Sequence, residues 1–126
     1  MNAYLDTQVA AWLYTGRAKR LSAEAKRQVE KNDVLISPMV FLELQYLYDR
    51  KRIHVEPVSV LAYLTATIGA TLCSFPFPSI ALAALKVGWT NDPFDRLIVA
   101  HAIANHEAPL ITADERIREN YFNAVW

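Results

Sequence analysis

Short apolar runs alternate with helix-like segments along the whole chain, and this alternation constrains the fold more than any other feature. The apolar runs fall at residues 3–5, 34–36, 70–75, 109–112 and 124–126. Between them, helices are predicted at 7–14, 22–31, 38–51, 57–69, 79–87, 93–106 and 115–120. Strands that alternate with helices favour βαβ units, in which helices cover both faces of a parallel sheet. We therefore expect an α/β fold.

Prolines, glycines and capping residues place several boundaries of these elements. Ser37-Pro38 and Asp92-Pro93 each combine a capping side chain with a proline at the first helical position. Gly69 suits the end of the helix that starts at residue 57. Two closely spaced prolines, Pro76 and Pro78, predict a turn before the helix at 79–87.

The composition is that of one globular domain spanning residues 1–126. Hydrophobic residues make up 53% of the chain and the formal net charge is zero, which argues against a disordered protein. A single cysteine, Cys73, excludes a disulfide scaffold and suits a reducing compartment. No apolar run has the length of a membrane span, and the first residues lack a signal-peptide pattern. We expect a cytoplasmic protein with no membrane partner.

Basic residues concentrate in the first half of the chain. Residues 1–52 hold nine Lys or Arg and six acids, and three basic clusters lie at 17–20, 26–27 and 50–52. Such clusters form either the solvated ends of helices or a basic rim that attracts a polyanion.

Two acids directly follow predicted strands. Asp6 follows the strand at 3–5, and Asp114 follows the strand at 109–112. Each is suited to capping the next helix, yet each also lies at the carboxyl edge of a parallel sheet, where ligands bind in such folds. Both interpretations stay open on spacing alone.

Glu43 is predicted to lie within an apolar stripe of its helix. Its neighbours three and four positions away are Met39, Val40, Tyr46 and Leu47. A buried ionised carboxylate is costly unless it pairs with a cation, which is either a basic side chain or a metal ion.

Asp95 falls at the third position of the helix that Asp92 caps. Its next neighbours on the same face are Ile98, Val99 and Ala102, all apolar. The alternative is an ordinary acid of the first turn, which interacts favourably with the helix dipole and turns back to the cap.

Several carboxylates at one sheet edge repel each other unless a cation neutralises them or their pKa values rise. Carboxylate oxygens select hard cations such as Mg²⁺ or Mn²⁺. The three histidines, His54, His101 and His106, are isolated, and Cys73 lies in an apolar run, so zinc and thiol chemistry are not supported. A hard cation beside basic residues suits hydrolysis of a phosphodiester bond.

The sequence resembles the PIN-domain nucleases, and most closely the VapC-type toxins of toxin–antitoxin pairs. The resemblance rests on four motifs in order: YLDT at 4–7, ISP at 36–38 with LEL at 42–44, DPFDRLIVA at 92–100 and LITAD at 110–114. It implies a single PIN-like domain, a three-layer α/β/α fold around a mainly parallel sheet.

The same resemblance implies a site and a function. Four acids would form the catalytic and metal-binding site: Asp6, Glu43, Asp95 and Asp114. Thr7 and Thr112 match positions where a hydroxyl supports a ligand. The implied activity is an endoribonuclease that uses Mg²⁺ or Mn²⁺, the toxin of a type II pair that a cognate antitoxin protein silences; homodimers are common in the family. The sequence departs from the pattern at Gln8, where similar relatives often have His, and at Thr90-Asn91, where a basic residue often stands.

Other interpretations stay open at this point. The chain could be an inactive PIN-like module that only binds RNA or a partner. A phosphoaspartyl hydrolase is disfavoured, because Gln8 stands where a second Asp would be needed. Arg96 is a candidate phosphate contact, although an ion pair would equally explain it. Aromatic residues, which make up 11% of the chain, could form a partner surface or ordinary core.

Overall fold

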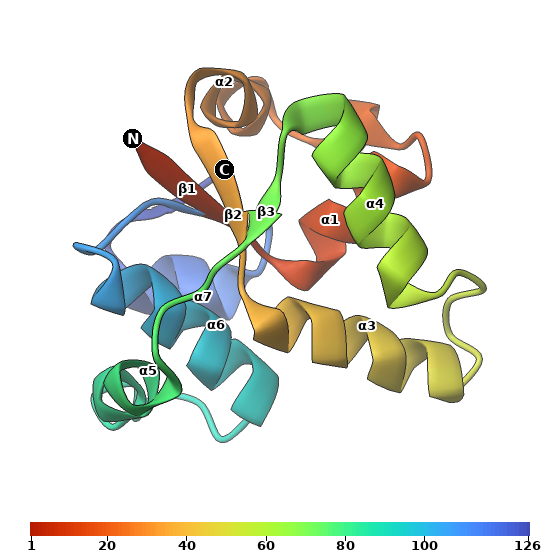
Figure 1. Cartoon of the computed structure of the whole chain (residues 1–126). Coiled ribbons are helices and arrows are strands. Elements are labelled where there is room, and N and C mark those ends of the chain that lie inside the picture. The colour runs from red at the N-terminus through yellow and green to blue at the C-terminus, as the bar shows by residue number, and fades with distance from the viewer.

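The chain forms a five-stranded parallel sheet between layers of helices in a computed structural model that describes all 126 residues (Figure 1). The strands are β1 (Asn2–Leu5), β2 (Asp33–Ile36), β3 (Thr71–Leu72), β4 (Leu110–Ile111) and β5 (Ala124–Val125). Their order across the sheet is β3-β2-β1-β4-β5, and every neighbouring pair is parallel. The predicted α/β class is confirmed.

Seven α-helices and one short 3-10 helix connect the strands. They are α1 (Thr7–Tyr14), η1 (Ala18–Arg20), α2 (Ala23–Lys31), α3 (Pro38–Asp49), α4 (Pro57–Ile68), α5 (Phe77–Ala84), α6 (Pro93–Ala104) and α7 (Glu115–Asn120). In Figure 1, α1 and α4 lie on one side of the sheet and α5 and α6 lie on the other, while α3 contacts both α4 and α6. This is the expected three-layer α/β/α arrangement. None of the helices combines the length and apolar character that crossing a membrane requires.

Two predicted elements differ clearly from the structure, and one short helix is additional. The third strand is Thr71–Leu72, shorter than the predicted 70–75, although the backbone N–H of Cys73 still donates to Ile36 at 2.8 Å. Helix α5 begins at Phe77 and includes Pro78, because the first turn of a helix needs no intrahelical acceptor for its N–H groups. Helix η1 was not predicted from the sequence.

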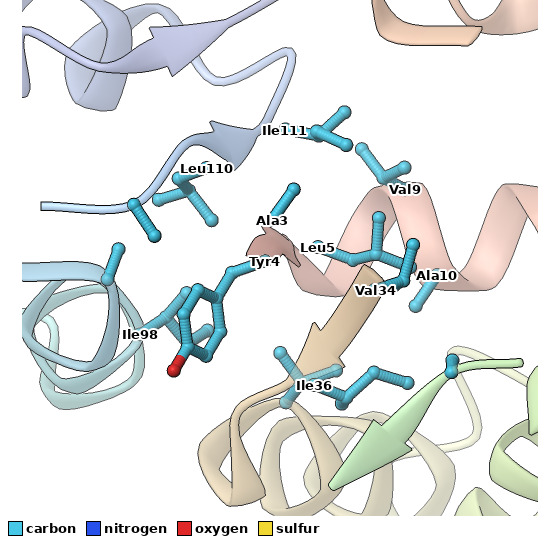
Figure 2. Close-up of a cluster of buried hydrophobic side chains, with 14 of the residues drawn as sticks. Ala3, Tyr4, Leu5, Val9, Ala10, Val34, Ile36, Ile98, Leu110 and Ile111 are labelled. Atoms are coloured by element: carbon cyan, nitrogen blue, oxygen red, sulfur yellow. The ribbon is translucent and has the colours of Figure 1, made fainter. Parts of the chain in front are cut away.

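Strand β1 lies at the centre of the hydrophobic core. Its side chains alternate between the two faces of the sheet, so Tyr4 points toward Ile98 of α6 while Leu5 lies beside Val9 and Ala10 of α1 (Figure 2). All five side chains are buried completely. The end of β1 is therefore held rigidly between the two helical layers.

The chain progression changes direction at β1. From β1 it runs through β2 to the β3 edge, and it then returns to β4 and β5 on the other side of β1. Leu5 pairs with Ile111, so the carboxyl ends of β1 and β4 lie next to each other. In open parallel sheets, ligands bind outside the carboxyl ends of the strands at such a switch point. Residues that follow β1 and β4 are the place to look for chemistry.

Candidate active site

Asp6 is the first residue after β1, and its carboxylate is nearly inaccessible, with 7% of the residue exposed. One oxygen, Oδ1, accepts a hydrogen bond from the backbone N–H of Thr7 at 2.8 Å, and the other, Oδ2, accepts one from the hydroxyl of Thr112 at 2.7 Å. Burial raises the pKa of Asp6, and these two hydrogen bonds oppose that rise. Asp6 caps α1 and also faces the other acids, so both interpretations of its position hold.

Asp114 lies across the switch point from Asp6. Its Oδ1 accepts from the backbone N–H groups of Arg116 at 2.9 Å and Ile117 at 3.1 Å, which caps α7. Its own N–H donates to the hydroxyl oxygen of Thr112 at 3.0 Å. Thr112 therefore connects the backbone of one acid to the carboxylate of the other.

Glu43 reaches the same site from α3. The hydroxyl of Thr7 donates a hydrogen bond to its Oε1. Burial raises the pKa of Glu43, and the charges of Asp6, Asp92 and Asp114 add to that rise. The two ion pairs of the chain join the N-terminal amine to Asp33 and Arg27 to Glu24, so no basic side chain pairs with Glu43.

Asp95 comes from the first turn of α6. Asp92 is the cap of this helix, as predicted, and accepts from the N–H groups of Phe94 at 2.8 Å and of Asp95 at 3.2 Å. The carboxylate of Asp95 itself makes no hydrogen bond back to the cap. Burial and the neighbouring charges of Asp6, Asp92, Asp114 and Glu43 raise the pKa of Asp95 to about 7.

The raised pKa values show that the four predicted acids interact electrostatically and form one cluster. Asp114 raises the pKa of Asp6, Glu43 and Asp95; Asp6 also raises that of Glu43 and Asp95, and Glu43 raises that of Asp95. Asp92 raises the pKa of all three as well, and the sequence analysis assigned it only as a cap. Its position three residues before Asp95, at the start of the same helix, was the available signal. Thr7 and Thr112 contact the acids as expected.

Arg96 contacts the end of α5. Its Nε donates to the backbone carbonyl of Ala84 at 2.8 Å, which fastens the end of α5 to α6. Its side chain takes no part in either ion pair of the chain.

The donors at this site are hard oxygens, which suit Mg²⁺ or Mn²⁺, and a cation would offset the repulsion that raises the pKa values. In the structure, however, no three acidic, histidine or cysteine side chains lie together closely enough to bind one ion. Asp6 is held by its hydrogen bonds, so binding would require the less constrained carboxylates, such as Asp95, to turn toward it.

A comparison with models of protein families identifies the family of this chain. The model described as the PIN domain matches residues 3–123, which is nearly the whole chain and includes all four acids. The chain belongs to the PIN domain family. A comparison with curated proteins finds no match.

This PIN domain is also similar to a chain in a solved structure, VapBC2 from Rickettsia felis bound to a DNA fragment from their promoter. The TM-score is 0.67 at 19% sequence identity, and the match covers 99% of this chain and 96% of the other. At this identity the likeness supports the fold of the PIN domain rather than its activity.

Proposed function

We propose that this PIN domain is a metal-dependent endoribonuclease, the toxin of a type II toxin–antitoxin pair. The observation that carries the proposal is the electrostatic cluster: Asp6, Glu43 and Asp95 are partly or fully buried near the switch point, and burial together with neighbouring acids raises the pKa of each. Such a cluster is typical of functional sites, because it lowers the stability of the folded protein and nothing in the fold itself requires it.

Each acid has a proposed role. Asp6, Asp95 and Asp114 hold Mg²⁺ or Mn²⁺, and Glu43 either joins them or orients the attacking water. When bound, the cation supplies a water of lowered pKa and stabilises the charge that develops on the phosphate. Thr112 holds the Asp6 carboxylate in place, and its hydrogen bond at 2.7 Å keeps that group oriented.

The proposed partners are an RNA substrate and a cognate antitoxin protein. The antitoxin is proposed because the similar structure is a VapBC2 complex, which contains its chains bound to promoter DNA. We place the reaction in the cytoplasm, where the free thiol of Cys73 would stay reduced.

The test is cleavage of a mixed RNA pool by the purified, antitoxin-free protein with Mg²⁺, with Mn²⁺ or with EDTA. We expect cleavage only with a divalent cation, and a loss of at least about 100-fold in Asp6→Asn and Asp95→Asn. Asp33→Asn is the matched control, because Asp33 is exposed and lies at the amino end of β2, whereas the site lies at the carboxyl ends of the strands.

The absence of cleavage by well-folded wild type, on the mixed pool and on a tRNA-rich pool from the host, would contradict the nuclease. It would favour the alternative of a PIN-like module that only binds RNA or a partner. Cleavage that persists in Asp95→Asn would contradict the site assignment and leave the activity in place. Circular dichroism of each variant checks that the fold is retained.

A further inference from the structure

A groove of about 620 Å³ opens between α1 and the loop that joins α3 to α4. One wall comes from α1 and the turn after it, with Gln8, Trp12 and Arg17; the other comes from the loop, with Arg52 and His54. The two walls are about 40 residues apart in sequence, and Figure 1 shows that α1, α3 and α4 lie together on the same side of the molecule.

The groove and the acidic cluster share two helices, α1 and α3. Gln8 lines the groove and follows Thr7, whose hydroxyl donates to Glu43. On α3, Leu44 lines the groove and directly follows Glu43. A strand bound in the groove thus lies against the two helices that carry Thr7 and Glu43.

Two arginines line the groove beside side chains that are mostly hydrophobic. Arg17 and Arg52, which line it, belong to the clusters at 17–20 and 50–52, and all six cations of these clusters are exposed. None of them takes part in either ion pair of the chain. The fold thus brings two basic clusters together beside one groove without neutralising them, although Asp49 and Glu56 flank the loop.

An aromatic ring forms part of the same wall. Trp12 is half-buried against Trp126, with ring centroids 5.9 Å apart, and the guanidinium carbon of Arg20 lies 5.7 Å from the Trp12 ring. Tyr14 also lines the groove. Aromatic faces beside arginines are how proteins bind single-stranded nucleic acid without reading its sequence, because every base can stack on them.

We propose that the RNA strand enters the active site through this groove, with its phosphates at Arg17 and Arg52 and a base against Trp12. The inference rests on the proposed nuclease and identifies the path of its substrate. RNA is favoured over a protein segment because the groove pairs two exposed, unneutralised arginines with an aromatic ring and shares its helices with the site proposed to cut a phosphodiester bond.

The direct test measures the binding of a fluorescein-labelled single-stranded RNA of mixed sequence. The fluorescence anisotropy of the RNA reports binding, and EDTA is present so that no cleavage occurs. We expect Arg17→Ala and Arg52→Ala each to weaken binding about fivefold or more. Each should also make the slope of log K against log salt shallower by about 0.7, the value for one phosphate contact on a single strand. Arg27→Ala is the matched control, since Arg27 is an exposed arginine on α2 that lies outside the groove.

The aromatic contact is tested separately. Trp12→Leu should weaken binding about tenfold, and Trp12→Phe should restore most of it, because stacking needs only a ring. Thermal unfolding of both variants separates this effect from the packing of Trp12 on Trp126.

Cleavage kinetics distinguish the groove from the active site. If the protein cuts RNA, the arginine variants should raise KM with kcat nearly unchanged. If both arginine variants bind RNA as tightly as wild type and with the same salt slope, the proposal is overturned. That result would favour a protein partner as the occupant of the groove. Groove-dependent binding by a protein that cuts no RNA would support the RNA path and contradict the nuclease.

Discussion

The carboxyl group of Asp95 carries the clearest electrostatic cost in the molecule. Burial and four neighbouring acids raise its pKa to about 7, whereas an aspartate in an unfolded chain titrates near 4. Below about pH 4 the group is protonated in both states and costs nothing. As the pH rises from about 4 to 7, the unfolded chain ionises first, so the free energy of unfolding falls and stays lower above pH 7.

Removing this charge should stabilise the metal-free protein. We expect Asp95→Asn to raise the free energy of unfolding by about 1 kcal/mol at pH 8, and by much less at pH 4.5, where the folded protein keeps Asp95 protonated. Urea unfolding in EDTA at the two pH values measures both. Asp33→Asn, an exposed acid, should show no such gain. A variant no more stable than wild type at pH 8 would show that the cluster does not strain the fold.

Thr112 is the second residue on which the site depends. Its hydroxyl donates to Asp6 at 2.7 Å and accepts the N–H of Asp114 at 3.0 Å, so it links both sides of the switch point. Its full burial leaves no water to take over these contacts.

Thr112→Val should therefore raise the Mn²⁺ concentration needed for half-maximal activity about 10- to 100-fold, because loss of a supporting hydrogen bond weakens metal affinity by about that factor. Thr112→Ser, which keeps the hydroxyl, should restore it. The measurement is a Mn²⁺ titration of RNA cleavage and of the thermal midpoint. Thr67→Val is the control, because the Thr67 hydroxyl bonds only the Tyr63 carbonyl on exposed α4. Equal Mn²⁺ requirements in wild type and Thr112→Val would contradict this role.

At the scale of elements, α3 and α6 are joined where each positions an acid. Ser37 caps α3, and its Oγ accepts from the N–H of Met39 at 3.0 Å. The same oxygen lies 2.9 Å from Nδ1 of His101, which is buried on α6 and also lies 3.0 Å from the Leu97 carbonyl. Burial lowers the pKa of His101, which keeps the imidazole neutral. One hydroxyl thus connects the helix of Glu43 to the helix of Asp95.

Ser37→Ala should cost about 2 kcal/mol, because it removes the cap and leaves a buried histidine nitrogen with one partner fewer. Ser22→Ala is the matched control. Ser22 caps α2 through the N–H of Ala25 at 3.0 Å and bonds no other helix, so the expected cost is about 1 kcal/mol. Urea unfolding compares the two. Equal losses would show that the contact with His101 adds nothing to the cap.

At the scale of the whole molecule, one edge of the sheet carries an uncharged surface. No Asp, Glu, Lys or Arg occurs between residues 57 and 85, a stretch that includes α4, the edge strand β3 and α5. Large apolar side chains are exposed along β3 and α5: Leu72, Phe75, Phe77, Leu82 and Leu85. In Figure 1 the chain runs from this edge strand directly to α5. Exposed apolar patches of this kind mark interaction surfaces, and the cores of interfaces are poor in charge.

We expect this surface to bind a second copy of the chain. A two-fold symmetric interface uses the same surface on both copies, so a surface without charge avoids the like-charge repulsion that would oppose self-association. Leu82→Glu should shift the protein from dimer to monomer, with at least a tenfold rise in the dissociation constant measured by sedimentation. Phe122→Glu, an exposed aromatic residue outside the surface, is the control. A wild type that is monomeric at high concentration would contradict the expectation.

Much of the fold was predictable because the signals that set it are local. Ser37-Pro38 and Asp92-Pro93 start helices in the structure as predicted, since a cap and a fixed φ act within a few residues. The shortened β3 and the start of α5 at Phe77 were missed, because pairing at a sheet edge depends on the neighbouring strand.

The site divides in the same way. Asp6, Glu43, Asp95 and Asp114 were candidates from their places after strands or within apolar helix faces, and the resemblance to PIN-domain nucleases implied that they form one site. The contacts that link them were not predicted, because the hydrogen bond of Thr112 to Asp6 joins residues 106 apart in sequence. The effect of Asp92 on the pKa values of the other acids was not predicted either. Nor was the groove lined by both Arg17 and Arg52, because it also joins residues far apart in sequence. The sequence by itself determined which elements and which chemical groups this PIN domain has. Only the tertiary structure decided which groups meet, because burial and charge interaction depend on distance through space rather than along the chain.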